Sequence, residues 1–158
     1  MQAWQELQGA GEIYLRTRRH PTVSALPLSA VIHSFDDVYE RADTFEEVYA
    51  QIASQVVGLG NRAEGVIYAV PGHPLVGESS VQRVLDLAKE RGLPVRIVAG
   101  LSFVEPICTR LGLDPLNGLQ VADAMMLAQH YYPEFNPDLP QHIPSHLQKL
   151  LTSDVKLV

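Results

Sequence analysis

The sequence predicts an α/β fold in which a mostly parallel sheet carries helices on both faces. Residues 66–70 are a continuous apolar run, which is typical of a parallel strand buried on both faces, and residues 95–98 are a second strand-like run, Val-Arg-Ile-Val. A helical pattern follows each run, and this alternation of strand and helix favours right-handed crossovers within one sheet. We therefore expect residues 66–70 and 95–98 to be adjacent parallel strands.

The composition of the chain excludes several classes of protein and partner. The chain has 158 residues, of which 46% are hydrophobic and 19% charged, so one domain with a sizeable core is expected. The net charge of -6 argues against nucleic acid or an anionic membrane as a partner. No apolar run approaches the roughly 18 residues of a membrane helix. The single cysteine, Cys108, excludes an internal disulfide and favours a cytoplasmic location.

The first half of the chain contains two helical patterns and two strand patterns. Residues 1–10 are predicted to be helical, and residues 12–17 and 30–33 to be short strands. The clearest helix begins at the cap Thr44, with Glu47 completing a capping box. Its apolar stripe consists of Phe45, Val48, Tyr49, Ile52, Ala53 and Val56, and Gly58 and Gly60 are expected to end it.

The second half of the sequence predicts two more helices, followed by a proline-rich segment. Helices are predicted over 79–91 and 103–111, after the two predicted strands described above. We expect an α/β domain over residues 1–131. Residues 132–158 are predicted to be a proline-rich linker, a short helix and a terminal strand that leads to a second domain.

Two loops carry the strongest signal for a binding site. Residues 71–78 follow a buried strand, at the edge where open α/β sheets place their ligands, and contain Gly72 and Gly77. Residues 100–103 follow the next predicted strand. We expect both loops at the same end of the sheet, as two walls of one cleft, although an ordinary strand–helix connection is the alternative for each.

Other motifs are weaker. The Gly-Leu-Gly-Asn-Arg-Ala run at 58–63 matches a dinucleotide fingerprint, but it follows a helix where that fingerprint must follow a strand. Glu46 and Glu47 resemble the start of a magnesium site of nucleotide pyrophosphohydrolases, yet Ala50 stands where the next acidic ligand is required. The histidine and cysteine spacing indicates neither a metal site nor an activated nucleophile, so no catalytic residue is assigned.

Four segments resemble the tetrapyrrole methylase family, and most closely the methylase-type domain at the N-terminus of MazG-family fusion proteins. They are Tyr14-Leu-Arg-Thr-Arg-Arg-His-Pro-Thr-Val23, Ser34-Phe-Asp-Asp-Val-Tyr-Glu40, Tyr68-Ala-Val-Pro-Gly-His-Pro-Leu-Val-Gly-Glu78 and Gly100-Leu-Ser-Phe-Val-Glu-Pro106. The resemblance implies methyl transfer from S-adenosylmethionine to an acceptor that it does not name. It places cofactor contacts on Gly72, His73, Pro74, Leu75, Val76, Gly77, Gly100, Leu101, Ser102 and Phe103.

The chain also departs from the family. His73 stands where the family has an aspartate, and family members begin with a strand and a glycine-rich loop that are absent here. They also continue into a second α/β domain. We therefore expect a half-site that binds the cofactor weakly or not at all, is inactive alone and self-associates as a homodimer. The alternative is a non-catalytic module of nucleotide metabolism that senses a ligand or docks a partner.

Overall fold

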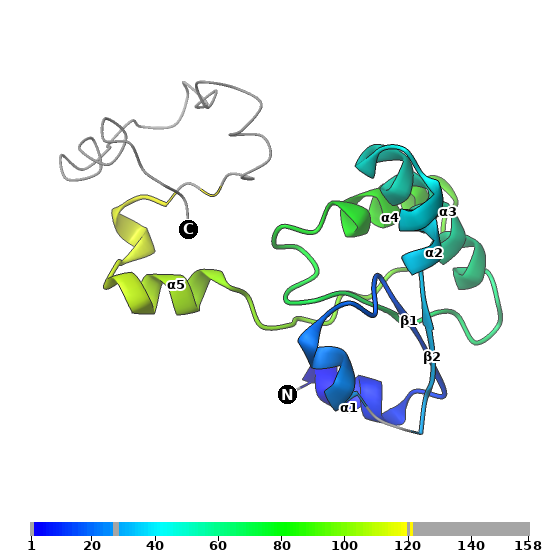
Figure 1. Cartoon of the computed structure of the whole chain (residues 1–158), viewed down its shortest axis with the longest axis horizontal. Helices are drawn as coiled ribbons and strands as arrows, with labels where there is room; N and C mark the ends of the chain where they lie inside the picture. Colours follow the sequence, from blue (N-terminus) through cyan, green and yellow to red (C-terminus); the bar gives the residue numbers. More distant parts are fainter. Residues whose placement is uncertain (1, 27–28, 120, 122–158) are drawn as a thin grey trace. The chain divides into compact units, whose positions relative to one another are not determined.

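A computed structural model describes residues 2–26, 29–119 and 121 (Figure 1). Residues 1–103 form one compact unit and residues 104–158 a second, and each is described by itself. The predicted linker, short helix and terminal strand at 132–158 lie outside the described residues. The first unit contains α1 (Gln2–Gly9), β1 (Glu12–Leu15), the 3₁₀ turn η1 (Pro21–Ala25), β2 (Val31–Ser34), α2 (Asp36–Arg41), α3 (Phe45–Gly60), β3 (Tyr68–Ala69) and α4 (Ser79–Glu90).

The sheet of the first unit has three parallel strands in the order β2-β1-β3. Tyr14 in β1 pairs with His33 on one side and with Tyr68 on the other. The Tyr14 amide donates to the Ile67 carbonyl at 2.9 Å, and the Arg16 amide donates to the Ala69 carbonyl at 3.0 Å. The predicted α/β class with a parallel sheet is confirmed.

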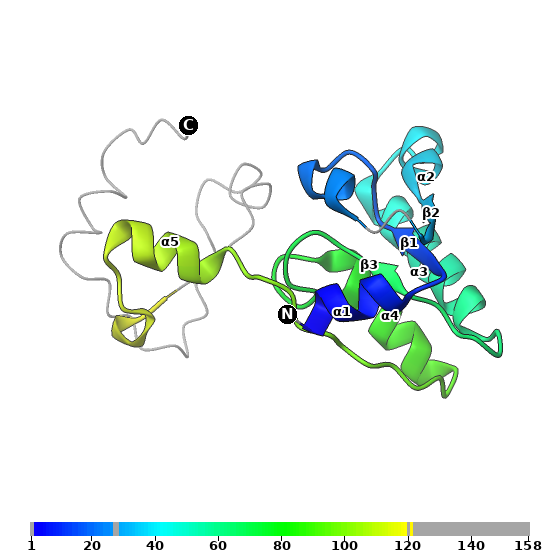
Figure 2. The ribbon, with the colours of Figure 1, turned by 90° about the horizontal axis from the view of Figure 1, so that it is seen from below.

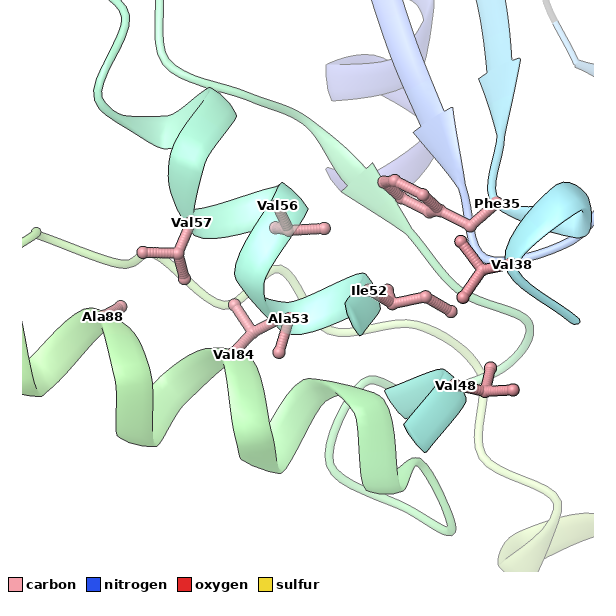
Figure 3. Close-up of a cluster of buried hydrophobic side chains, with 9 residues drawn as sticks. All are labelled: Phe35, Val38, Val48, Ile52, Ala53, Val56, Val57, Val84 and Ala88. Atoms are coloured by element: carbon pink, nitrogen blue, oxygen red, sulfur yellow. The ribbon is translucent and has the colours of Figure 1, made fainter. Parts of the chain in front are cut away.

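The larger apolar core lies between one face of the sheet and helices α2, α3 and α4 (Figure 3). Ile52 and Val38 are fully buried at its centre, and Val84 and Ala88 of α4 pack against the same cluster. The aromatic rings of Tyr14 and Tyr68 reach this core from the sheet. This packing fixes α4, and therefore the loop before it, relative to the strands.

A smaller core covers the opposite face of the sheet. Ile13 and Leu15 of β1 are buried there and pack against Leu7 of α1 and Val23 of η1. Because neighbouring residues of a strand point to opposite faces, Ile13 and Leu15 share one core while Tyr14 joins the other. Helical segments thus cover both faces, as predicted.

The capped helix forms as its sequence indicates. The Thr44 hydroxyl accepts a hydrogen bond from the Glu47 amide at 3.2 Å, while the Glu47 carboxylate accepts from the Asp43 amide at 3.1 Å. The helix includes Gly58 and ends at Gly60, the second of the two glycines expected to end it. Phe45 is 60% exposed, so the buried stripe starts one turn later, at Val48.

The expected pairing of residues 66–70 with 95–98 is wrong. Only Tyr68 and Ala69 are assigned to a strand, and residues 95–98 form none. The two segments instead line one cavity of about 430 Å³. A segment becomes a strand only when a neighbouring strand takes its backbone hydrogen bonds, and the backbone of residues 95–98 forms none with the described residues.

The described part of the second unit contains α5 (Val104–Leu111) and the 3₁₀ turn η2 (Pro115–Asn117). The helix predicted at 103–111 is therefore present. Cys108 is its one buried residue. In the described ranges, every helix falls short of the length and apolar character needed to cross a membrane.

Candidate functional site

The glycine loop, residues 71–78, leaves β3 at its carboxyl end and leads into α4. Gly72 and Gly77 have φ angles of 80° and 68°, values that residues with a side chain rarely adopt. The sharp turns at both ends of the loop therefore require glycine. They direct its backbone, without side chains, toward the edge of the sheet where ligands bind.

The second loop, residues 100–103, lies directly against the glycine loop. A Cβ placed on Gly100 would be only 1.9 Å from the Gly72 carbonyl oxygen. A Cβ on Gly72 would be 3.4 Å from the Leu101 carbonyl oxygen. The two loops predicted to share one end of the sheet therefore do meet there, and Gly100 is what allows the close contact.

His73 shapes the glycine loop from within. Its Nδ1 accepts a hydrogen bond from the Leu75 amide at 3.1 Å, and its carbonyl accepts from the Val76 amide at 3.0 Å. An aspartate carboxylate forms the same side-chain turn by accepting from the amide two residues ahead. The His73 ring thus closes a turn of the kind that an aspartate side chain forms.

Apolar side chains of the two loops remain open to a ligand. Leu75 and Phe103 are each 47% exposed and Leu101 is 89% exposed. A Cβ on Gly77 would lie 3.7 Å from the Phe103 ring, so this glycine and the ring are close neighbours. Exposed apolar groups beside uncovered backbone are the surface that a planar, polar-edged ligand uses.

The cavity reaches only part of this constellation. Gly72, Pro74 and Gly100 line it, together with residues 66–70 and 93–98. The other predicted contacts, namely His73, Leu75, Val76, Gly77, Leu101, Ser102 and Phe103, are not among its lining residues. The two loops therefore border this cavity through Gly72, Pro74 and Gly100, and their role as the two walls of one cleft stays a prediction.

A buried polar network holds the last residue of the glycine loop in place. Arg16, which follows β1, places Nη1 3.4 Å from the carboxylate of Glu78, whose side chain is only 4% exposed. The same carboxylate accepts from the Ser80 hydroxyl at 2.9 Å, and that hydroxyl pairs with the Tyr68 hydroxyl at 2.8 Å. The network therefore ties the end of the loop to β1, β3 and the first turn of α4.

Sequence reasoning missed this network. In the sequence, Glu78 is only the last residue of the predicted loop, and Arg16 lies inside the predicted strand at 12–17. A charged residue placed directly after a buried strand is the one signal that could have marked Arg16.

Burial raises the pKa of the Tyr68 hydroxyl well above its ordinary value of 10, so this group stays protonated and serves as a hydrogen-bonding partner.

Asp36 holds the ends of β1 and β2 together at the same edge. Its carboxylate accepts hydrogen bonds from the Thr17 hydroxyl and, at 2.9 Å, from the Arg18 amide. Burial opposes ionisation of Asp36, but these hydrogen bonds outweigh it and lower the pKa of the carboxyl below 3.8.

Within the described ranges, no group of three or more His, Cys, Asp or Glu residues could hold a metal ion.

Comparison with known proteins identifies the family. The sequence profile described as Tetrapyrrole (Corrin/Porphyrin) Methylases matches residues 1–152, nearly the whole chain. The chain belongs to the tetrapyrrole methylase family. The glycine loop and the loop at 100–103 are therefore loops of a tetrapyrrole methylase-like domain.

Curated relatives are much longer proteins. The chain is 38% identical over 123 residues to uncharacterized protein YabN of Bacillus subtilis (strain 168), covering 77% of this chain and 25% of that protein. It is 28% identical over 107 residues to cmaMA of Coprinopsis marcescibilis, named a methyltransferase and type I borosin cyclic peptide precursor, covering 68% of this chain and 25% of that protein. It is 32% identical over 83 residues to gymMA1 of Gymnopus fusipes, named a methyltransferase and gymnopeptides precursor, covering 52% and 19%. The chain thus spans about a quarter or less of these relatives.

Proposed function

We propose that the glycine loop and the loop at 100–103 bind S-adenosylmethionine as part of a methyltransferase. The observation that carries the proposal is the contact between Gly72 and Gly100, which brings both loops together beyond the carboxyl end of β3. Uncovered backbone at Gly72 and Gly77 suits the polar groups of the cofactor, and the exposed Leu75 and Phe103 suit its adenine ring. Family membership and the two relatives named as methyltransferases support the same activity.

The protein contributes to the reaction by holding the cofactor in position for methyl transfer. When bound, S-adenosylmethionine supplies a methyl group on a positively charged sulfur, and transfer needs that methyl in line with a nucleophile of the acceptor. We assign the backbone of Gly72, Gly77 and Ser102 to holding the cofactor, and Leu75, Val76 and Phe103 to apolar contacts. The Arg16–Glu78 pair acts on the cofactor only through the loop that it supports.

Calorimetric titration of the full chain with S-adenosylmethionine tests the proposal. We expect weak binding, in the millimolar range, because the loops offer mainly backbone and apolar contacts and each missing polar contact is worth about 1 kcal/mol. Gly72→Trp should abolish binding, while Gly58→Trp, on the distant α3, should retain it. No heat at millimolar cofactor, or equal binding by both variants, contradicts the assignment.

A separate proposal concerns the protein beside which this domain works. From the resemblance of its four segments to methylase-type domains of MazG-family proteins, we infer that the domain works beside a nucleotide pyrophosphohydrolase. Adding the purified chain to a MazG-type pyrophosphohydrolase should change its rate of nucleoside triphosphate hydrolysis or show complex formation in light scattering. Cofactor binding that alters this rate without any methyl transfer would favour the sensing module over the enzyme.

A further inference from the structure

A second hollow in the first unit lies beside β2, the edge strand of the sheet. It encloses about 610 Å³, a volume typical of sites for small molecules. Figure 2 shows β1, β2, α2 and α3, the elements that line it, next to one another. We call this hollow the edge pocket, and the lining residues that matter below are Tyr14, His33, Asp37, Gln55, Gly58 and Arg62. Among the described residues, its lining includes none from the glycine loop or from the loop at 100–103, so it is separate from the candidate cofactor site.

Two stacked rings form one side of the edge pocket. The rings of Tyr14 in β1 and His33 in β2 lie almost parallel, with centroids 4.5 Å apart and an interplanar angle of 15°. In the described part of the sheet no strand lies beyond β2, and the His33 side chain is 40% exposed. A third flat ring can therefore continue the stack from His33, as nucleobases do on aromatic side chains.

Glu12 holds the two rings in place. Its Oε1 accepts a hydrogen bond from the Tyr14 hydroxyl at 3.0 Å and lies 2.9 Å from His33 Nε2. Its Oε2 accepts from Arg62 Nη2 at 2.7 Å, and the Arg62 guanidinium lies 5.7 Å from the centroid of the Tyr14 ring. The stack is therefore fixed before a ligand arrives, so binding does not have to order it. Because both oxygens of Glu12 already have partners, a ligand must find its hydrogen bonds at other residues.

Asp37 and Gln55 supply polar groups on the other side of the edge pocket. The Asp37 side chain pairs with Arg41 but is 59% exposed, and Gln55 of α3 is exposed as well. A carboxylate only accepts hydrogen bonds and has about four sites for them, whereas an amide both donates and accepts. A guanine base suits this set, because its N1–H and N2 amine are adjacent donors and its O6 is an acceptor beside them. Adenine presents an acceptor nitrogen in place of N1–H, and a carboxylate repels such an edge.

We propose that the edge pocket binds guanine nucleotides, with the base stacked on His33 and its N1–H and N2 amine bound by Asp37. The Gln55 amide donates to O6. Gly58 keeps the pocket open, since a Cβ at this position would meet nothing within 4 Å. S-adenosylmethionine carries adenine and lacks this pair of donors, so the edge pocket is a second site with a different ligand.

An NMR titration of the full chain with guanosine 5′-monophosphate tests the inference. Inosine 5′-monophosphate, which lacks only the N2 amine, and adenosine 5′-monophosphate, which lacks both donors, are the matched controls. We expect amide shifts at His33 and Gly58, with a Kd about tenfold higher for the inosine nucleotide and at least about tenfold higher again for the adenosine nucleotide. Equal affinities would mean that only the shared phosphate and ring are bound, and would overturn the inference. So would the absence of shifts at millimolar guanosine nucleotide.

Two variants locate the site. Gly58→Trp places a side chain in the edge pocket and should abolish the shift at His33 while S-adenosylmethionine still binds at the loops. Asp37→Asn should remove the preference for guanosine over adenosine nucleotide, because an amide also donates. Asp86→Asn, an exposed change on α4 outside the pocket, is the control and should keep that preference. Undiminished binding by Gly58→Trp, or an unchanged preference in Asp37→Asn, would contradict the assignment. None of these outcomes depends on whether the loops bind the cofactor.

Discussion

Arg16 Nη1 lies 3.4 Å from Glu78 Oε1, which joins the end of β1 to the residue that closes the glycine loop. The Arg16 side chain is 24% exposed and that of Glu78 4%, and Arg16 Nε is buried without a hydrogen-bond partner within the described residues. The pair is therefore largely withdrawn from water, and its integrity decides where the loop sits.

Removing the arginine should destabilise the protein strongly. Arg16→Met leaves the Glu78 carboxylate buried without its cation, and we expect the free energy of unfolding to fall by about 3 kcal/mol. The control is Arg19→Met, because Arg19 pairs with Glu40 at the surface, with side chains 75% and 64% exposed. That change should cost less than about 0.5 kcal/mol. Urea denaturation measures both, and equal effects would show that the buried pair has no special weight.

The contact between the loops should make Gly100 intolerant of any side chain. In Gly100→Ala the new Cβ would clash with the Gly72 carbonyl, which is backbone and cannot simply rotate away. We expect a loss of about 2 kcal/mol or more and weaker cofactor binding.

Gly58→Ala provides the matched control for that substitution. A Cβ on Gly58 meets nothing within 4 Å, and the residue lies inside α3, where alanine favours the helix. This change should stabilise the protein by about 0.5–1 kcal/mol. Thermal unfolding that moves in the same direction for both variants would contradict the described contact.

Asp36 should contribute to stability at neutral pH and lose that contribution in acid. Its carboxyl has a pKa lowered in the folded state, so folding favours the ionised form. The contribution is complete above the ordinary pKa, near 3.8, and disappears as the pH falls through the lower folded pKa. Asp36→Asn should therefore reduce stability at pH 7 and flatten its fall in acid. A parallel acid limb in the variant would exclude Asp36 as the group responsible.

We propose that the chain forms a twofold dimer through the exposed edge of the sheet. β2 is an edge strand, and Val31 at its start is 59% exposed. Light scattering should give a mass near twice 17.4 kDa at high concentration. Val31→Lys should return it to the monomer, because a charged edge residue opposes strand pairing. A constant monomer mass for the native chain would refute the dimer.

The sequence predicts those elements whose signal is local. Helix α3 follows from Thr44, Glu47 and a stripe of spaced apolar residues, all within one segment. The sequence does not predict helix α2, because its six residues bury only Val38 and its N-terminus has no hydrogen bond from a capping side chain. The run at 95–98 shows the opposite failure, since its composition favours a strand but a strand also needs a partner.

The sequence likewise predicts one part of the candidate site and not the other. The two loops can be predicted from glycines that follow strand patterns, and they do meet at Gly72 and Gly100, although the strand expected before the second loop does not form. The Arg16–Glu78 pair cannot be read so, because it depends on how β1 pairs with β3 and how α4 packs below the loop. Long-range pairs of charges leave no periodic pattern in a sequence.

The most direct measurement of the central claim is a map of amide chemical shifts during titration with S-adenosylmethionine, recorded by NMR on the full chain. We predict saturable shifts at Gly72, Gly77 and Gly100, reproduced by S-adenosylhomocysteine and absent with adenosine monophosphate at equal concentration. Gly58, on α3, should not shift. Shifts confined to residues outside both loops, or none at millimolar cofactor, would contradict the assignment of these loops as the cofactor site.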